Sequence, residues 1–289
     1  MTKRPVHSIA VASGKGGTGK TLLATNLAAK ISRDMPVVLA DLDVEEPNTS
    51  VFMADPPKTT TDQYKLIPEW DQGKCVLCDV CTTVCRFHAI VKLGEMIVVF
   101  KELCHSCYAC SELCPEQALP MKEHKIGTIS TWQKENFTLV ESRLEVGEEQ
   151  AVPMIHLAQQ HLSDQYQKTP LHIYDCPPGT SCPMVASVKE VDEVILVTEP
   201  TPFGLNDLKL AVETMRLMEK PFGVVINRYG IGDTAVEEYC EKEKIPILAR
   251  VRFDREIASL YSRGEMVFDK IDHFAEALSE IQTRLGLNL

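Results

Sequence analysis

A glycine-rich turn near the start of the chain constrains the fold more than any other feature. Residues 14–21 read GKGGTGKT and fit the pattern GxxxxGK[ST]. They follow an apolar, β-rich run, HSIAVAS, and precede a segment of helical character, TLLATNLAAKIS. A strand, a glycine-rich loop and a helix in this order are the context that a phosphate-binding P-loop requires. The sequence therefore predicts an α/β nucleotide-binding core.

The residue types of this loop suit a nucleoside triphosphate and its metal ion. Its glycines let backbone N–H groups approach phosphate oxygens, Lys20 would neutralise the β- and γ-phosphates, and Thr21 would bind Mg²⁺. The expected nucleotide-binding residues are Gly14, Lys15, Gly16, Gly17, Thr18, Gly19, Lys20 and Thr21. The alternative is a glycine turn before an ordinary helix, and the flanking strand and helix together disfavour it.

Short apolar runs alternate with helical segments along the rest of the core. The strand candidates are PVVLADLD, LHIYDCPP, EVILVTE and PFGVVIN, and STWQKENFTLVESRLEVG reads as a pair of strands. EEQAVPMIHLAQQHLSDQ and NDLKLAVETMRLMEK have helical periodicity. This alternation predicts a doubly wound, mostly parallel sheet covered on both faces. The Pro- and Thr-rich stretch 46–62 is expected to be a loop that leads out of the core.

Eight of the eleven cysteines form a repeated motif. The spacing CxxCxxCxxxC occurs at Cys75, Cys78, Cys81 and Cys85 and again at Cys104, Cys107, Cys110 and Cys114. It resembles the run of bacterial ferredoxins, in which the fourth cysteine of one run binds the other run's 4Fe-4S cluster. That exchange assigns Cys75, Cys78, Cys81 and Cys114 to one cluster, and Cys104, Cys107, Cys110 and Cys85 to the second. Zinc ribbons, the main alternative, rarely repeat this triple spacing.

This motif predicts an inserted domain. We expect residues 65–121 to form an α+β ferredoxin-like domain with two 4Fe-4S clusters, and residues 1–64 and 122–289 to form the P-loop core. Its charge is nearly balanced, so the clusters and not a surface field are expected to give the insert its purpose. Because it leaves the core some twenty residues after Asp43, we expect nucleotide hydrolysis to move it.

Two residues beside the cysteine runs bear on the cluster surroundings. Pro115 follows Cys114, as in ferredoxins, whereas Arg86 follows Cys85. A proline at this place shapes the backbone near a cluster, so the second cluster is expected to differ in exposure or potential. His105 lies between two ligands and is expected to be a surface histidine, with a hydrogen bond to a cluster sulfur as the alternative.

Composition excludes several partners. Thirty basic and 41 acidic residues give a net charge of -11, and no clustered Lys/Arg stretch suits nucleic acid or lipid headgroups. No apolar run approaches the roughly 20 residues that span a bilayer. The P-loop motif starts too early to leave room for a signal peptide, so we expect a cytoplasmic protein whose thiols mostly bind metal.

The second lysine of the loop, Lys15, makes the motif resemble the deviant-Walker P-loop ATPases, the group of MinD, ArsA, Mrp and the nitrogenase iron protein. Most of the chain resembles MinD/Mrp-type ATPases, with an inserted ferredoxin domain. The resemblance implies a homodimer, or a heterodimer with a paralogous ATPase, in which Lys15 reaches the partner's ATP and stabilises charge during phosphoryl transfer. An exposed, solvated lysine is the alternative.

The same resemblance implies further roles. In DLD, Asp43 would be catalytic and near Mg²⁺, while Asp41 would be structural. In YDCPPGT, Asp175 would be an outer-sphere Mg²⁺ residue and Gly179 would donate its N–H to the γ-phosphate; a plain two-proline turn is the alternative. Asn227, in VINR, would read adenine with its amide. The positions that resemble purine-side loops are Pro200 and Asp254, which are equally consistent with ordinary loop ends.

Three cysteines lie outside the repeated motif. Cys182 follows Asp175 by seven residues, the offset of a cluster ligand in the nitrogenase iron protein, but no second cysteine lies between Cys114 and Cys176. A dimer-interface metal or redox thiol at Cys182, joined by Cys176, is therefore one interpretation. We expect instead that both pack as small buried thiols, as does Cys240.

Two functions remain open from the sequence. In the first, ATP turnover drives assembly or transfer of an iron–sulfur or other metal cofactor into a client metalloprotein, with the insert supplying electrons. In the second, the protein is an ATP-gated electron donor to a redox acceptor. The acidic tail IDHFAEALSEIQTRLGLNL disfavours a membrane-positioning role.

Overall fold

The structure is a computed structural model that describes residues 6–287, and the chain forms two compact units. Unit 1 comprises Met1–Thr61, Ile129–Arg143 and Ile155–Leu289. Unit 2 comprises Asp62–Thr128 and Leu144–Met154. Unit 2 contains the repeated cysteine motif and extends beyond the range 65–121, because it takes in a second, separate stretch of chain.

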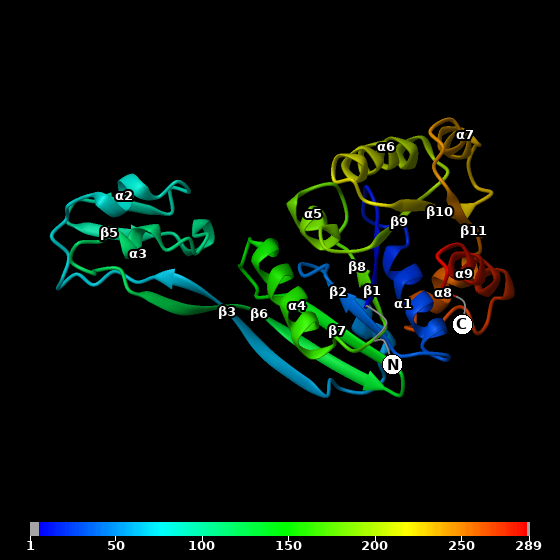
Figure 1. Cartoon of the computed structure of the whole chain (residues 1–289), viewed down its shortest axis with the longest axis horizontal. Coiled ribbons are helices and arrows are strands. Elements are labelled where there is room, and N and C mark those ends of the chain that lie inside the picture. The colour runs from blue at the N-terminus through cyan, green and yellow to red at the C-terminus, as the bar shows by residue number, and fades with distance from the viewer. Residues whose placement is uncertain (1–5, 288–289) are drawn as a thin grey trace. The chain divides into compact units, whose positions relative to one another are not determined.

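Unit 1 is built on a sheet of β-branched and aliphatic strands. The strands are β1 His7–Ala12, β2 Val37–Asp41, β7 Phe137–Leu144, β8 Leu171–Asp175, β9 Glu193–Thr198, β10 Phe222–Tyr229 and β11 Ile247–Arg252, with β3 Thr59–Pro68 and β6 Met121–Lys134 continuing into unit 2. The sheet order is β11-β10-β9-β1-β8-β2-β7-β6-β3 (Figure 1). Neighbouring strands from β11 to β7 are all parallel, which confirms the mostly parallel α/β core.

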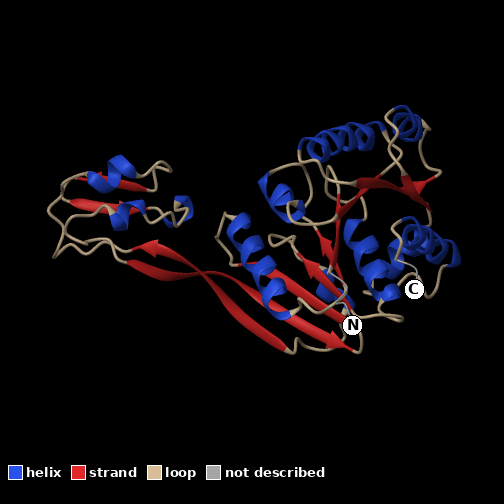
Figure 2. Ribbon diagram, in the orientation of Figure 1, coloured by secondary structure: helices blue, strands red, loops and turns tan. Residues whose placement is uncertain are grey.

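Helices cover both faces of this sheet (Figure 2). They are α1 Lys20–Ile31, α4 Ala151–Gln165, α5 Cys182–Val188, α6 Pro202–Leu217, α7 Ala235–Lys242, α8 Arg255–Ser262 and α9 Asp272–Arg284, with a 3-10 turn at Thr49–Phe52. The start of α6 illustrates the local signals: the Thr201 hydroxyl accepts the Gly204 N–H at 3.0 Å and Pro202 opens the helix. None of the helices within residues 6–287 is both long and apolar enough to cross a membrane.

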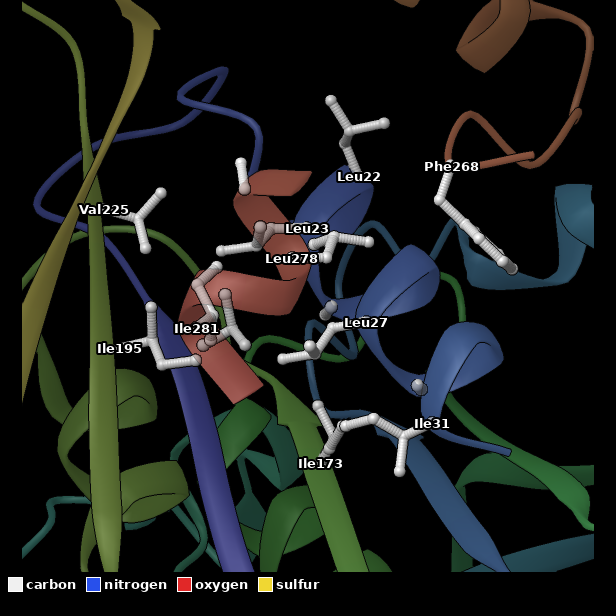
Figure 3. Close-up of a cluster of buried hydrophobic side chains, with 14 of the residues drawn as sticks. Leu22, Leu23, Leu27, Ile31, Ile173, Ile195, Val225, Phe268, Leu278 and Ile281 are labelled. Atoms are coloured by element: carbon white, nitrogen blue, oxygen red, sulfur yellow. The ribbon is translucent and has the colours of Figure 1, made fainter. Parts of the chain in front are cut away.

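A large hydrophobic core lies on one face of the sheet. Figure 3 shows Leu23 and Leu27 of α1 beside Leu278 and Ile281 of α9, with Ile173 of β8 nearby. All five side chains are almost completely buried. This core packs the helix that follows the glycine-rich loop directly against the strand before it, and so holds residues 14–21 at the carboxyl edge of the sheet.

Unit 2 has short elements and a small core. They are α2 Val80–Val84, β4 Ile90–Leu93, β5 Met96–Val99, a 3-10 turn at Lys101–Leu103, and α3 Ala109–Glu112. Strands β4 and β5 form an antiparallel pair. Two groups of buried residues pack within it, Cys81, Ile90, Ile97, Cys110 and Leu119 in one, and Ile67, Ala89 and Cys104 in the other.

Three sequence-based expectations about elements were wrong. The stretch 46–62 is not only loop, because it holds a 3-10 turn and the start of β3. The first residues of β3, TTTDQ, are largely exposed and show no apolar alternation that could reveal a strand. Strand β6 begins at Met121 and not near Ser130, and β11 was not recognised in its short, charge-interrupted run.

Candidate functional site

The glycine-rich loop connects β1 to α1 and needs glycine at particular positions. Gly17 and Gly19 have φ of 79° and 97°, in the left-handed region that favours glycine. A Cβ at Gly14 would lie 2.2 Å from the Asp207 carbonyl oxygen, and a Cβ at Gly19 would lie 2.3 Å from Asn227 Nδ2. Glycine is therefore required here by the backbone conformation of the loop and by its close approach to Asp207 and Asn227.

A cavity of about 360 Å³ lies beside this loop. Of the residues expected to bind nucleotide or Mg²⁺, those that line it are Gly16, Gly17, Gly19, Lys20, Thr21, Asp43 and Asn227. Its size is within the range of small-molecule sites. Lys20, the first residue of α1, is buried, so its ammonium contributes positive charge that solvent screens weakly.

Other parts of the lining were not foreseen from the sequence. They are Leu22, Glu46, Asn48, Pro178, Arg228, Arg252, Phe253, Ile257, Ala258 and Tyr261, together with Asp254, which had been expected there only as an even alternative to a loop end. Most come from the end of β11 and from α8. Asp254 also caps α8, since its carboxylate accepts the Glu256 N–H at 2.8 Å.

Asp41 is buried inside a hydrogen-bond network and does not line the cavity. Its Oδ2 accepts N–H groups from Asn48 and Thr49, each at 3.1 Å, and the Thr49 hydroxyl at 2.9 Å. Its Oδ1 accepts the Asp43 N–H at 3.1 Å. Burial raises the pKa of Asp41 well above its usual value. These contacts hold the loop after β2, as expected of a structural aspartate.

Asp43 and Asp175 are carboxylates on which the Lys20 charge acts. Burial raises the pKa of Asp43 to about 6 and that of Asp175 to about 7, and the Lys20 ammonium opposes both shifts. Both oxygens of Asp175 are buried without a hydrogen-bond partner among residues 6–287. A buried, unpaired carboxylate is unfavourable unless a cation compensates it. Together with the Thr21 hydroxyl, these hard oxygen donors fit Mg²⁺.

Lys15 is held by a buried acid. Its Nζ lies 3.7 Å from Glu199 Oε2, and Arg228 Nη1 lies 2.8 Å from Glu199 Oε1. Lys15 is partly exposed, whereas only 8% of the Glu199 side chain is exposed. In this structure Lys15 is therefore paired with Glu199 and is not an exposed, solvated lysine. Glu199 was not identified from the sequence, because nothing local marks it as the partner of two distant cations.

Asn227 and Gly179 both hydrogen-bond within the protein. Asn227 Nδ2 donates to the Thr18 carbonyl at 2.7 Å, and its Oδ1 accepts the Arg228 N–H at 2.9 Å. Gly179, with φ of 92°, donates its N–H to the Ser13 carbonyl at 2.9 Å. Asn227 thus ties β10 to the glycine-rich loop. In this structure the Gly179 N–H is directed at the backbone of the segment that joins β1 to α1.

The eight cysteines of the repeated motif line two separate cavities in unit 2. The first is lined by Cys75, Cys78, Cys81 and Cys114, and the second by Cys85, Cys104, Cys107 and Cys110. Each cavity thus gathers three thiols of one run and the last thiol of the other. Burial raises the pKa of the Cys81 and Cys104 thiols, and raises that of Cys110 to about 11. Free thiols here would remain protonated, whereas bound metal stabilises thiolates.

The backbone around the two cavities repeats. The non-glycine residues with positive φ in this region form three matched pairs, Leu77 and Ser106, Asp79 and Tyr108, and His88 and Gln117. Such conformations cost of order 1–3 kcal/mol each and persist where the surroundings impose them. The Ala89 N–H donates to Cys85 Sγ at 3.3 Å, and the Ala118 N–H donates to Cys114 Sγ at 3.2 Å. The chain wraps both cavities in the same way.

This donor set fits two cubane clusters. Soft thiolates suit iron–sulfur clusters, and the Trp70 Nε1–H, which lines the first cavity, is buried without a partner among the described residues. A cluster sulfur can accept such a donor. Within residues 6–287, no group of three or more His, Cys, Asp or Glu side chains converges on a single ion.

The two residues noted beside the cysteine runs have local explanations. Arg86 is exposed, and the turn after Cys85 matches the turn after Cys114: the N–H groups of His88 and Gln117 donate to the two cysteine carbonyls at 3.3 and 3.1 Å. The turn after Cys85 therefore has the same hydrogen bond as the turn after Cys114, although only Cys114 is followed by a proline. His105 is exposed and stacks on Phe87 with ring centroids 3.8 Å apart, as expected of a surface histidine.

The remaining cysteines differ in burial. Cys176 and Cys240 are fully buried, in agreement with packing roles, and Cys176 Sγ lies 3.8 Å from the Tyr174 carbonyl oxygen. Cys182 is exposed at the start of α5, so the expectation that it packs as a buried thiol was wrong. The short helix begins there and leaves its first side chain in solvent.

Comparisons with known proteins agree with the core fold. Residues 9–267 match the family described as CobQ/CobB/MinD/ParA nucleotide binding domain. An uncharacterized protein of Methanocaldococcus jannaschii is 29% identical over 94% of this chain and 95% of its own length. An iron-sulfur cluster carrier protein of Pyrococcus horikoshii is 25% identical over 87% of this chain and 76% of its own length. The cell division ATPase MinD of Pyrococcus furiosus has a TM-score of 0.60 at 19% identity, covering 98% of this chain and 99% of that one.

Proposed function

The chain belongs to the CobQ/CobB/MinD/ParA nucleotide-binding family, and from this premise we propose that it is a dimeric ATPase that assembles or transfers a metal cofactor. The cofactor would be an iron–sulfur cluster or another metal group, delivered to a client metalloprotein. The observation that carries the proposal is one chain with a nucleotide-sized cavity beside a P-loop and two four-cysteine cavities. Relatives named iron-sulfur cluster carrier proteins support it.

The residues of the large cavity suit ATP hydrolysis. The backbone of residues 16–19 would hold the phosphates, Lys20 would neutralise their charge, and Thr21 with Asp43 and Asp175 would hold Mg²⁺. Asp43 would orient the attacking water; with a pKa of about 6 it is mostly ionised at neutral pH. Lys15 would leave Glu199 to reach the ATP of a second protomer.

The cysteine cavities would hold two resident 4Fe-4S clusters in a ferredoxin-like insert. Cys75, Cys78, Cys81 and Cys114 would bind one, and Cys104, Cys107, Cys110 and Cys85 the other. Bound there, the clusters supply one-electron chemistry. The insert would provide electrons for work on the client, and the exposed Cys182 would be a candidate contact for a labile metal at the dimer interface.

A second function, ATP-gated electron donation to a redox acceptor, is favoured by one observation. In each cavity the chain draws thiols from both cysteine runs, and at least one of them is buried. Such an arrangement suits clusters that stay in place and carry electrons, and suits cargo less well. The two functions differ in whether metal leaves the protein.

Metal transfer during turnover separates the two. The chain is loaded anaerobically with ⁵⁷Fe and sulfide and incubated with Mg-ATP and an apo-ferredoxin acceptor. Assembly predicts a further labile metal species that moves to the acceptor and is lost in Cys182→Ser. Electron donation predicts that all iron stays on the chain while the acceptor is reduced faster during turnover. If neither transfer nor reduction responds to ATP, both functions are wrong.

A matched control tests the ATP requirement. Lys20→Ala should abolish ATP hydrolysis and, with it, the ATP dependence of metal transfer or of electron donation. The iron and sulfide contents should stay at about eight each per chain. An anaerobic pull-down from native extract would then identify the client. Metal transfer at an undiminished rate in Lys20→Ala would contradict a role for the nucleotide cavity.

A further inference from the structure

The two cysteine cavities have different charged neighbours, although their backbones repeat. Behind the second cavity lies Lys65, of which only 6% of the side chain is exposed. A buried lysine is rare unless it is paired. It lies on β3 two residues before Ile67, whose side chain packs with Cys104, so both side chains are on the same face of the strand. Lys65 thus lies close to Cys104, one of the four thiols that line the second cavity.

Polar groups of unit 2 fix the position of the Lys65 ammonium. Nζ donates to the Lys101 carbonyl at 3.2 Å and to Gln150 Oε1 at 3.4 Å, and lies 3.3 Å from Glu148 Oε2. The other carboxylate oxygen of Glu148 is 2.5 Å from His124 Nε2. Glu148 therefore contacts both His124 and Lys65, and it is the carboxylate paired with the Lys65 ammonium.

One peptide group links this ammonium to a cysteine of the second cavity. The Lys101 carbonyl that accepts the Lys65 hydrogen bond also accepts the Cys104 N–H, at 3.2 Å. The Lys65 ammonium and the Cys104 N–H thus meet at one oxygen atom. The positive charge of Lys65 would stabilise a bound, negatively charged cluster.

The first cavity has a lysine too, but in a different setting. Lys92 Nζ donates to the Leu77 carbonyl at 3.0 Å, within the first cysteine run, and lies 2.8 Å from Asp79 Oδ1. The exposed fraction is 31% for the Lys92 side chain and 53% for Asp79. Solvent and ions screen an exposed pair much more than a buried one. Lys92 should therefore act on its cavity more weakly than Lys65 does.

We propose that Lys65 is a positioning residue for the second cluster, and that its buried ammonium makes the cluster in the Cys104 cavity easier to reduce than the cluster in the Cys75 cavity. Reduction adds one electron to a cluster, and a nearby fixed positive charge stabilises the added charge. The inference rests on the proposed binding of two 4Fe-4S clusters. It adds an internal direction, because electrons that enter the insert would collect at the second cluster.

Reduction potentials of the intact, reconstituted chain test this inference. The two one-electron couples are followed by EPR-monitored titration, and the couple of the Cys104 cavity is assigned with Cys107→Ser. In the unaltered chain this couple should have the higher potential. Lys65→Met should shift its equilibrium about tenfold toward the oxidised cluster, which is about 59 mV for one electron. Lys65→Arg keeps the charge and should leave the potential close to that of the unaltered chain.

Lys92→Met is the matched control in the other half of the insert. It should move only the other couple, by no more than about threefold, because its charge is screened. Should Lys65→Met fold poorly by circular dichroism, Lys65→Gln removes the charge but keeps a polar group that can reach the Lys101 carbonyl, and the same shift is expected.

The outcomes separate this inference from the proposed function. A chain that binds no iron overturns the cluster function and this inference together. A chain that binds about eight irons and about eight sulfides keeps the cluster function. If Lys65→Met then leaves both potentials unchanged, or lowers both equally, the inference alone is overturned. A shift in Lys65→Arg as large as in Lys65→Met would also overturn it, since charge would then not be the cause.

Discussion

Unit 1 and unit 2 bury very different amounts of apolar side chain. A large core of unit 1 joins strands and helices through aliphatic and aromatic residues such as Leu27, Ile173 and Phe274. The two small cores of unit 2 contain three cysteines among their buried members, Cys81, Cys104 and Cys110. Where a larger domain would pack aliphatic side chains, unit 2 packs thiols.

This difference indicates how each unit is stabilised. Small cores rarely supply enough burial to offset the loss of chain entropy, and small domains compensate with metals or disulfides. The repeated positive-φ residues around the cysteine cavities add conformational strain. Unit 1 should therefore fold by burial alone, and unit 2 should depend on its bound clusters.

Removal of iron should have the largest effect. Loss of the clusters should leave unit 2 without cooperative structure, because its ligands form much of its core, while unit 1 keeps its own unfolding transition. Limited proteolysis with mass spectrometry, before and after chelation under acid, should show new cleavage confined to residues 62–128 and 144–154. Equal protection of unit 2 in both states would contradict this dependence.

Replacement of the P-loop lysine should have the next largest effect, on unit 1 alone. Lys20→Ala should reduce ATP hydrolysis by about a thousandfold, because the variant loses the charge that stabilises phosphoryl transfer.

Lys15→Ala should reduce hydrolysis more than nucleotide binding, as expected of a residue that acts across a dimer. Phosphate release and calorimetric titration measure the two. Equal losses of binding and hydrolysis in Lys15→Ala would argue against that role.

Truncation of a buried side chain should destabilise only the unit that contains it, and the effect should be smaller than in the two experiments above. Leu27→Ala should lower the unfolding free energy of unit 1 by about 2–5 kcal/mol, with iron content unchanged. The matched variant in unit 2 is Ile97→Ala, since both side chains are buried in their own cores. It should speed iron loss to a chelator and leave the unit 1 transition in place. Denaturant unfolding measures the first effect, and chelator kinetics the second.

A hydrogen-bonded surface acid in unit 1 should give the smallest effect. Asp192 Oδ2 accepts the Ser8 N–H and hydroxyl, each at 2.8 Å. Burial alone would raise the pKa of Asp192, but the Ser8 hydrogen bonds and nearby charges together lower it below 3.8. Its contribution is thus present at neutral pH and lost as the pH falls below that value.

Asp192→Asn should therefore destabilise unit 1 by about 0.5 kcal/mol at pH 7. The difference from the unaltered chain should vanish at low pH, as measured by denaturant midpoints from pH 7 to pH 3. A difference independent of pH would show that the carboxylate charge is not the cause.

The parts that could be predicted from the sequence are those encoded by short, local patterns. The loop at residues 14–21 and both cysteine runs carry their spacing within one stretch of chain, and buried parallel strands such as β9 are continuous apolar runs. In the structure the loop lies beside the large cavity, and the thiols of the two runs line two smaller cavities.

The parts that were missed depend on contacts between distant residues. Arg252 and Tyr261 reach the large cavity only because β11 lies at the end of the sheet and α8 follows it. Glu199 meets Lys15 and Arg228 from three separate segments. Lys65 reads as an ordinary strand lysine until the fold buries it. The local pattern of polar and apolar residues does not indicate such contacts between distant segments.

The chain leaves unit 1 and returns to it on neighbouring strands. Thr60 Oγ1 and Ser130 Oγ, on β3 and β6, lie 3.0 Å apart, and the Lys58 N–H donates to the Thr131 carbonyl at 2.7 Å. A turn of a few residues could therefore close this pair in place of the long intervening segment. By design, residues 62–128 could thus be exchanged as one segment, together with the side chains of residues 144–154 that belong to the same unit, while the strands from β11 to β7 stay as they are.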